Sequence, residues 1–329
     1  MSAYLSALNS VQQEAVKQTE GPVMVIAGAG SGKTRVLTFR MAYLMEKGVD
    51  PFNILALTFT NKAAREMKGR IEKLLGGTEA KNLWMGTFHS IFARILRIEG
   101  HRLGYPSNFT IYDTEDAQKV ISGLIKDRGL DKDIYKVKAV ASRISAYKNN
   151  LITPKAYQNR ADLQEADASA RMPQLGELYG AYMEKCFRAG AMDFDDLLLK
   201  TNELFIKFPD ALARYQERFK YILVDEYQDT NHSQYLIVQA LASRFENLCV
   251  VGDDAQSIYA FRGANIRNIL NFQKDYPDAK LFKLEQNYRS SGCIVQAANS
   301  LIKHNQDQLE KNVWTSNPQG ERIVVHKSV

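Results

Sequence analysis

The chain has 329 residues, of which 45% are hydrophobic and 24% charged, and its 43 basic and 37 acidic side chains give a formal charge of +6. This composition excludes a disordered protein, a collagen-like fibre and a small disulfide scaffold. No apolar run reaches the roughly 18 residues of a membrane-spanning helix. The basic excess favours an acidic partner such as nucleic acid, but it is too modest to decide the matter.

The three cysteines predict neither a zinc site nor a disulfide framework, because Cys186, Cys249 and Cys293 lie far apart without a Cys-x-x-Cys pattern. The first residues lack the basic start and long apolar stretch of a secretory signal. We therefore expect a cytoplasmic protein that does not bind membranes.

A helix is predicted to begin near Ser10. Ser10 with Gln13 fits a capping box, which leaves the Gln12 side chain free, and Asn9 with Gln12 is the alternative cap from spacing. A free side-chain amide has both a donor and an acceptor to offer a ligand.

Short apolar runs that end in polar or glycine residues predict strands buried on both faces. These runs cover residues 23–27, 54–59, 221–224, 248–252 and 281–284. Helical patterns lie between them, for example at residues 35–45, 64–74 and 88–96. The alternation predicts an α/β fold with a doubly wound parallel sheet, whose ligands bind at the carboxyl ends of the strands.

The strand signal disappears between about residues 104 and 190, which predicts a helical insertion and not a second sheet. Basic and aromatic side chains alternate in this stretch, which fits either a solvated helix face or a nucleic-acid surface. The side chains concerned are Lys136, Lys138, Arg143, Lys148, Lys155, Tyr135, Tyr147 and Tyr157.

The segment after the first strand has the pattern of a phosphate-binding loop. Residues 27–34 read AGAGSGKT and stand between a predicted strand and a predicted helix. Glycines let backbone N–H groups surround the phosphates, Lys33 would neutralise phosphate oxygens, and Thr34 would bind Mg²⁺. Ala27 stands where the usual pattern has its first glycine.

A second acidic signal follows the strand at residues 221–224. Asp225 and Glu226 form a carboxylate pair at its tip, which is costly unless it faces a cation or an open cleft. Asp225 would hold Mg²⁺ through water and Glu226 would orient or deprotonate an attacking water. The alternative is a structural role, with Asp229 capping the next helix. Together with the loop, the pair predicts a nucleoside triphosphatase, and residues 61–64 (NKAA) lack the aspartate of a guanine-reading loop.

Six ordered motifs resemble the UvrD/Rep/PcrA group of superfamily-one DNA helicases. They are GAGSGKT, TFTNKAA (58–64), GTFHS (86–90), DEYQDTN (225–231), VGDDAQSIYAFRGA (251–264) and LEQNYRS (284–290), and the resemblance covers nearly the whole chain. It implies a RecA-like P-loop core with an α-helical insertion, and an ATP- and Mg²⁺-dependent motor that moves 3′ to 5′ on single-stranded DNA and separates duplex DNA.

The resemblance also implies roles at the nucleotide. Lys33, Asp225, Glu226, Gln256 and Arg289 would be catalytic, with Gln256 and Arg289 reaching the γ-phosphate, and Thr34 and Asp225 would hold Mg²⁺. Gln12 would contact adenine and Tyr288 would stack near the base. The ATP-contacting set is Gln12, Ala27, Gly28, Ala29, Gly30, Ser31, Gly32, Lys33, Thr34, Arg35, Tyr288 and Arg289.

The DNA track implied by the resemblance combines polar side chains with aromatic rings, which accept any base. Its positions are Phe59, Asn61, Thr87, Phe88, His89, Tyr259, Phe261 and Arg262. Phe261 replaces the tryptophan that relatives often carry. Phe88 shares a helical stripe with Phe92, so it is also a candidate for the core.

The resemblance places the RecA-like core at residues 1–104 and 191–285, the insertion at residues 105–190, and the start of a second motor domain at residues 286–329. Relatives are roughly twice as long, so we expect this chain alone to have little ATPase and no unwinding activity. A helicase–nuclease subunit of the RecB type and a non-catalytic ATP- or DNA-binding module are the alternatives. The pathway (repair or replication) and protein partners are not specified by these residues.

Overall fold

The computed structural model describes residues 3–76, 79–260, 263–305 and 308–327, which form two compact units. Unit 1 comprises residues 1–87, 215–230 and 241–329, and unit 2 comprises residues 88–214 and 231–240. The predicted insertion at residues 105–190 lies within unit 2, which extends beyond it on both sides. None of the helices in the described ranges has both the length and the apolar character needed to cross a bilayer.

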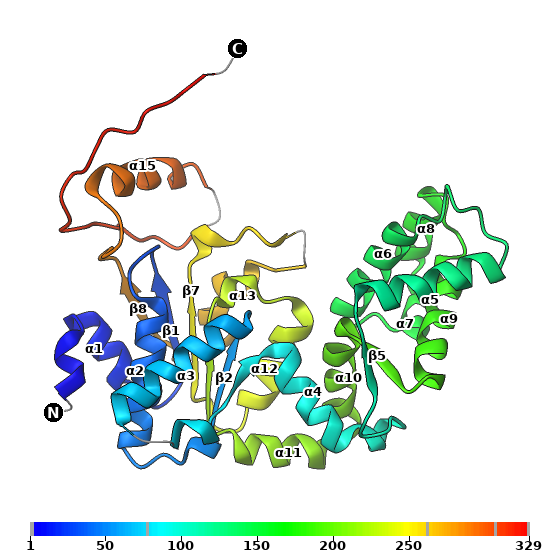
Figure 1. Cartoon of the computed structure of the whole chain (residues 1–329), viewed down its shortest axis with the longest axis horizontal. Coiled ribbons are helices and arrows are strands. Elements are labelled where there is room, and N and C mark those ends of the chain that lie inside the picture. The colour runs from blue at the N-terminus through cyan, green and yellow to red at the C-terminus, as the bar shows by residue number, and fades with distance from the viewer. Residues whose placement is uncertain (1–2, 77–78, 261–262, 306–307, 328–329) are drawn as a thin grey trace. The chain divides into compact units, whose positions relative to one another are not determined.

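Unit 1 is built on a six-stranded sheet with the order β3-β2-β6-β7-β1-β8, and its neighbouring strands are parallel (Figure 1). The strands are β1 (Val23–Ala27), β2 (Ile54–Thr58), β3 (Trp84–Thr87), β6 (Tyr221–Val224), β7 (Leu248–Gly252) and β8 (Lys280–Leu284). The predicted parallel α/β sheet is confirmed, and each of the five apolar runs forms a strand. The sixth strand, β3, has the sequence WMGT, whose mixed character gave no apolar run.

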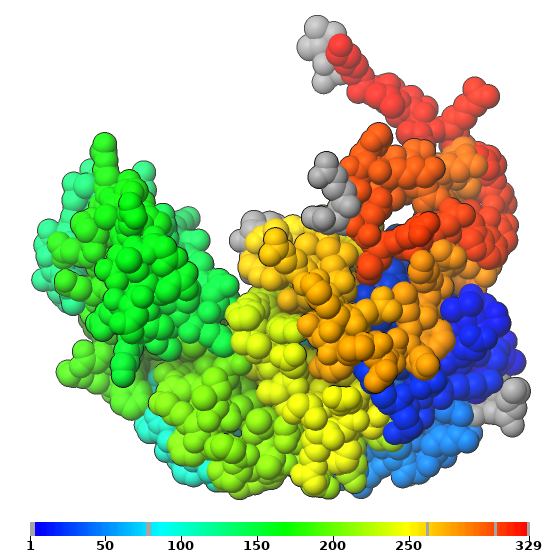
Figure 2. All heavy atoms as spheres, turned by 180° about the vertical axis from the view of Figure 1, so that it is seen from behind, coloured from blue at the N-terminus to red at the C-terminus, as the bar shows by residue number. Residues whose placement is uncertain are grey.

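Apart from α1, which precedes β1, the helices of unit 1 come after a strand, as the parallel connections require. They are α1 (Ser10–Lys17), α2 (Lys33–Glu46), α3 (Asn61–Leu75), α13 (Arg267–Leu270), α14 (Phe272–Asp275) and α15 (Gly292–Ile302). Two more helices, α11 (Pro209–Arg218) and α12 (His232–Ala242), each contribute residues to both units. In Figure 2 the orange segment that includes β8 lies against the blue N-terminal residues.

The main core of unit 1 lies between one face of the sheet and helices α1, α2 and α3. Alternate residues of β1, namely Val23, Val25 and Ala27, share this core with Met67 and Ile71 of α3. The intervening strand residues are also buried, so the strands are covered on both faces. Each large apolar side chain buried in this way contributes about 1.5–3 kcal/mol to folding. The core thus fixes the carboxyl ends of β1 and β6, where the charged side chains stand.

Unit 2 is mainly helical. Its helices are α4 (Phe88–Glu99), α5 (Thr114–Asp127), α6 (Val137–Asn149), α7 (Pro154–Gln158), α8 (Ala161–Ser169), α9 (Leu175–Arg188) and α10 (Phe194–Lys207). Tyr135, Tyr147 and Tyr157 belong to its core and are 5–6% exposed. The three tyrosines are therefore core residues, and they form part of neither a solvated helix face nor a nucleic-acid surface.

The prediction of an insertion without a sheet was wrong in one detail. A short parallel pair joins β4 (Thr110–Tyr112) to β5 (Ala191–Asp193). Each strand has only three residues, which is too short for a periodic pattern to show in the sequence.

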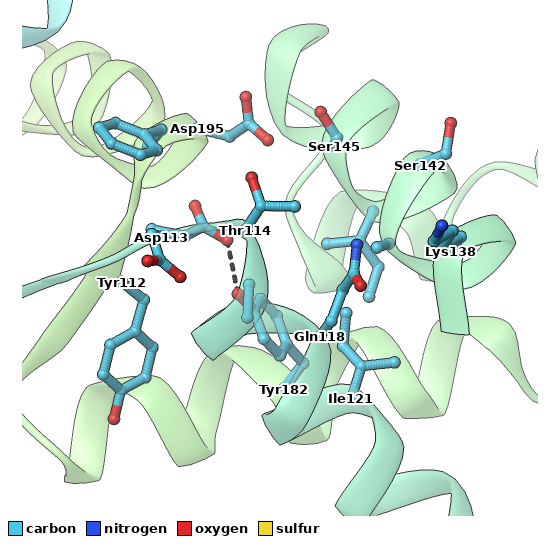
Figure 3. Close-up of a pocket in the computed structure, with 15 residues that line it drawn as sticks. Tyr112, Asp113, Thr114, Gln118, Ile121, Lys138, Ser142, Ser145, Tyr182 and Asp195 are labelled. Carbon is cyan, nitrogen blue, oxygen red and sulfur yellow. Dashed lines mark hydrogen bonds between the residues drawn. The ribbon is translucent and has the colours of Figure 1, made fainter.

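A buried ionic cluster joins α6 to the start of α10. The Lys148 ammonium is completely buried and lies 2.7 Å from Asp193 and 2.8 Å from Asp196. Tyr182 donates a hydrogen bond to Asp193 beside a cavity of about 270 Å³ (Figure 3). Burial alone would lower the pKa of Lys148, but the two carboxylates raise it above its usual value. The cluster is therefore a closed part of the core in which both carboxylates contact the Lys148 ammonium, although Asp196 Oδ1 makes no hydrogen bond among the described residues.

Candidate active site

The phosphate loop joins β1 to α2 and depends on glycine at two positions. Gly30 (φ +69°) and Gly32 (φ +91°) adopt the left-handed region that side chains disfavour. Ala27 is instead the last residue of β1, pairs with Leu284 of β8 and is completely buried. Its backbone is extended, so the departure from glycine at this position costs no strain.

Helix α2 begins at Lys33 directly after the loop. Its N-cap, Gly32, has no side chain to satisfy the first N–H groups, so the helix amino end offers them to an anion. Thr34 and Arg35 belong to the same turn, and the Arg35 guanidinium lies 5.4 Å from the centre of the Phe39 ring. The loop and the helix start together form a site suited to phosphate.

The acidic pair stands at the tip of β6 and contacts the phosphate-loop lysine. Lys33 Nζ lies 2.9 Å from Glu226 Oε2. The backbone of Asp225 is anchored by its N–H, which donates to Leu57 O of β2 at 3.0 Å. Glu226 has a φ of +49°, an uncommon value for a residue with a side chain. Lys33, at the start of α2 after β1, thus lies next to Glu226 and near Asp225, both of which follow β6.

Two carboxyl groups in this site have raised pKa values. Burial, together with the Glu226 charge, raises the pKa of Asp225 to about 7, although Lys33 acts in the opposite direction. Burial and Glu226 likewise raise the pKa of Asp229 to about 6. A second cation would relieve both carboxyl groups.

The interpretation of Asp229 as a helix cap was wrong. The Asn231 side chain accepts a hydrogen bond from Gln234 N at 2.9 Å at the start of α12. Within the part of the chain that the structure describes, Asp229 Oδ1 is instead buried without a hydrogen-bond partner. The hydroxyl of Thr34 and the carboxylates of Asp225 and Asp229 are hard oxygen donors of the kind that suits Mg²⁺, and the orphaned oxygen fits a site for such an ion or its water.

The expected cap at the N-terminal helix was also wrong, because the alternative box forms. Asn9 accepts from Gln12 N at 2.8 Å, and Gln12 Oε1 accepts from Asn9 N at 3.2 Å. Gln12 Nε2 donates to Ser31 O of the phosphate loop at 2.9 Å, and the residue is 2% exposed. Gln12 is therefore not free, but it is fixed against the loop.

Tyr288 and Arg289 also lie at the phosphate loop. Tyr288 N donates to Gly30 O at 3.0 Å, and the half-exposed Tyr288 ring places its hydroxyl 2.8 Å from Asn9 Nδ2. The Arg289 backbone is held by Asn287 Oδ1, and Asn287 Nδ2 donates to Ala29 O at 2.6 Å. The sequence motif did not identify Asn287 as a site residue, although it ties the last motif to the loop.

Gln256 belongs to a hydrogen-bonded chain that reaches Glu226. Its side-chain nitrogen donates to Asp253 Oδ2 at 2.5 Å. Gln228 Oε1 accepts from Asp253 N at 3.0 Å, and Gln228 Nε2 donates to Glu226 Oε2 at 3.0 Å. Sequence reasoning missed Gln228, whose only signal was its place inside the DEYQDT run.

The residues assigned to DNA fall in both units. In unit 1, Phe59 directly follows β2, and Thr87 is the last residue of the neighbouring strand β3. Asn61 begins α3, and Tyr259 is 37% exposed. Phe59 and Thr87 thus lie side by side at the carboxyl ends of two neighbouring parallel strands. Phe261 and Arg262 lie outside the described residues.

The residues in unit 2 differ from one another. Phe88 is 1% exposed and packs against Phe92 with ring centres 6.0 Å apart, so it belongs to the core. His89 meets Phe194 edge-on at 5.8 Å, and burial lowers the pKa of His89. Phe194 is 48% exposed, a property that the sequence did not reveal because the residue begins a largely buried helix.

Comparison with known proteins identifies the family of the chain. The model of the UvrD/REP helicase N-terminal domain matches residues 8–277, and that of the UvrD-like helicase C-terminal domain matches residues 282–329. The ATP-dependent DNA helicase PcrA of Bacillus subtilis strain 168 is 51% identical over 98% of this chain and 43% of its own length. Its namesake in Staphylococcus aureus strain Mu50 is 49% identical over 100% of this chain and 44% of its own length. The chain spans less than half the length of these relatives, and it belongs to the UvrD/REP helicase family.

Proposed function

We propose that this chain carries the ATP-binding and hydrolysing part of a DNA helicase that moves 3′ to 5′ on single-stranded DNA and unwinds duplex DNA. The observation that carries the proposal is the 2.9 Å contact between Lys33 of the phosphate loop and Glu226 at the tip of β6. Two charged groups from separate sequence motifs meet where a parallel sheet binds its ligands. The relatives named ATP-dependent DNA helicase support the choice of ATP and DNA.

In the proposed reaction, the glycine loop and the start of α2 bind the phosphates, and Lys33 neutralises their charge. Lys33 would exchange Glu226 for phosphate oxygens, which would leave the Glu226 carboxylate able to take a proton from the attacking water. Gln256 and Arg289 would contact the γ-phosphate. Bound Mg²⁺, held by Thr34 and Asp225, would supply positive charge to the phosphates.

The base would lie near α1. Gln12 and Tyr288 are each hydrogen-bonded to the phosphate loop. Both are also hydrogen-bonded to Asn9, which links them to each other. For Gln12 to pair with adenine, its bond to Ser31 O has to be replaced by one to the base. ATP binding would therefore reorganise the amino end of α1.

In unit 1, the residues that would contact DNA are Phe59, Asn61, Thr87, Tyr259, Phe261 and Arg262. In unit 2, taken by itself, His89 and the exposed ring of Phe194 would do so. Stacking contributes about 1–3 kcal/mol per base and is indifferent to sequence, which suits a motor that has to pass every base. Phe88 is buried in unit 2, so it would not contact a base directly.

A titration with fluorescent ATP and Mg²⁺, with and without a single-stranded oligonucleotide, tests the proposal. The wild-type chain should bind the nucleotide, and Lys33→Ala should weaken binding by roughly tenfold to a hundredfold, because a charged hydrogen-bond donor is removed. Lys62→Ala, at an exposed lysine, is the matched control. Unaltered affinity in Lys33→Ala would contradict the assignment, whereas a purely DNA-binding module would keep its oligonucleotide affinity and show no nucleotide binding.

A further inference from the structure

Residues 309–315, here named the strap, lie across the phosphate loop and the motif that carries Gln256. The Val313 side chain sits so close to Gly28 that a Cβ atom at Gly28 would be only 2.6 Å from it. Trp314 N donates to Glu285 O at 2.9 Å, and Asn287 N donates to Trp314 O at 2.7 Å. The strap is therefore bonded to the segment that positions Arg289.

The other part of the strap is fixed by a buried ionic contact. Lys311 Nζ lies 2.5 Å from Asp254 Oδ1 and 3.1 Å from Asp253 Oδ1, and the three side chains are 0–8% exposed. Leu309 N donates to Asp254 Oδ2 at 2.9 Å. Breaking a buried ionic contact on one side leaves an uncompensated charge, so this junction has one strongly preferred arrangement.

Asp253 connects this junction to the candidate active site in two ways. Its second carboxylate oxygen accepts from the Gln256 side-chain nitrogen, which leaves the Gln256 amide in a defined orientation. Its backbone N–H donates to Gln228, whose nitrogen donates to the Glu226 carboxylate beside Lys33. A continuous set of contacts thus runs from Lys311 to Lys33, although Lys311 itself contacts neither Glu226 nor the phosphate loop.

We propose that Lys311 is a positioning residue that holds Gln256 for recognition of the γ-phosphate by fixing the carboxylate of Asp253. The strap belongs to residues 282–329, the region matched by the C-terminal family model. It would thereby couple the conformation of this region to the binding of the γ-phosphate. This inference rests on the proposed ATP function. It adds a residue that lies outside the six motifs.

The experiment measures discrimination between nucleotides, since a residue that only stabilises the fold would not change it selectively. ADP and the non-hydrolysable ATP analogue AMP-PNP are titrated with Mg²⁺ on the full chain, and the ratio of the two dissociation constants is compared between variants. Lys311→Met should reduce the preference for AMP-PNP roughly tenfold, the effect of removing one hydrogen bond to a charged group, and should change ADP affinity less than twofold. Lys311→Arg should restore most of the preference, because the cation is retained.

The control is Lys303→Met, which makes the same chemical change at an exposed lysine at the end of α15. If Lys311→Met gives no cooperative melting transition, Lys311→Gln replaces it, because the neutral amide can still donate a hydrogen bond to Asp254 while the cation beside Asp253 is lost. A smaller loss of preference in the same direction would then support the inference.

The outcomes separate this inference from the proposed function. A wild-type chain that binds neither nucleotide overturns both. A wild-type chain that binds both but does not distinguish them, or a folded Lys311→Met (or Lys311→Gln) variant that keeps the wild-type ratio, overturns the role of Lys311 alone.

Discussion

Each unit contains a cluster of buried carboxylates, and the two clusters differ in how these carboxylates are paired with a lysine. In unit 2, Lys148 is completely enclosed and paired with Asp193 and Asp196, and its charge lowers the pKa of Asp193 despite burial. In unit 1, none of the described cations forms an ion pair with Asp225, and the pKa of Asp225 is raised to about 7. Lys33 pairs instead with Glu226, whose side chain is 35% exposed.

We infer that the ionic cluster around Lys148 stabilises the fold of unit 2, whereas the carboxylates beside Lys33 in unit 1 are available to bind a ligand. Both clusters contain shifted pKa values, so a shift alone does not mark a functional site. Asp196 of unit 2 also has a raised pKa, of about 6, and an Oδ1 atom without a hydrogen bond, but that atom lies 2.8 Å from the Lys148 ammonium. Among the described residues, what distinguishes unit 1 is that neither Asp225 nor Asp229 has an ion pair with a cation, although the pKa of each is raised. The following variants test the distinction.

The largest effect is expected when the closed cluster loses its cation. Lys148→Met leaves two buried carboxylates uncompensated and should lower the free energy of unfolding by about 3–5 kcal/mol, measured by chemical denaturation. Lys155→Met, an exposed lysine of α7, should change it by less than about 0.5 kcal/mol. A loss for Lys148→Met that is no larger than the control would remove the contrast between the units.

A pair of phenylalanines in unit 2 gives the next comparison. Phe88→Ala should cost about 3–5 kcal/mol of stability, because it opens a cavity in the core. Phe194→Ala should leave stability nearly unchanged and weaken binding of a single-stranded oligonucleotide by about 1–3 kcal/mol. Fluorescence anisotropy and denaturation of both variants check this, and equal stability losses would contradict the assigned burial.

The raised pKa of Asp225 predicts a pH dependence of stability. The carboxyl group is protonated more readily in the folded chain, so its contribution is fully present below about pH 4 and is lost as the pH rises to about 7. The wild type should therefore lose up to about 1.4 kcal/mol per pH unit relative to Asp225→Asn across this window. Parallel unfolding profiles of the two proteins at pH 5, 6, 7 and 8, without nucleotide, would refute the shift.

The smallest effect concerns the exposed basic residues of the insertion. Lys136 and Lys138 are exposed, in contrast to the buried Lys148. If they bind DNA phosphates, the double change to alanine should reduce the slope of log affinity against log salt by about one for each phosphate that is no longer neutralised. A slope that stays the same in an anisotropy titration between low and moderate salt would exclude them from the DNA-binding surface.

The sequence predicted the parts of the fold whose physical signal is local. Parallel strands are buried on both faces, so β1, β2, β6 and β7 appeared as continuous apolar runs, whereas the mixed WMGT of β3 did not. The choice between Ser10 and Asn9 as the helix cap could not be made from spacing, because both pairs fit it. The structure has the Asn9–Gln12 box, and the bond from Gln12 to Ser31 is a tertiary contact that helix-cap spacing does not show.

The candidate site was predictable where a motif fixes local geometry, as in the phosphate loop, and not where distant segments meet. Nothing local shows that Lys311 reaches Asp254, 57 positions earlier in the chain. Likewise, the tyrosines of the insertion had the same spacing whether they faced solvent or the core, and only packing around Leu175 and Leu178 assigns them to the core.

The extended backbone of Ala27 has a consequence for how such loops are recognised by pattern. A search template that demands glycine at this position rejects the chain, although the main chain there has no special torsional requirement. A template written from the torsion angles would reserve glycine for positions 30 and 32 and accept any small residue at 27. Such a rule would recover other triphosphate loops that a literal consensus overlooks.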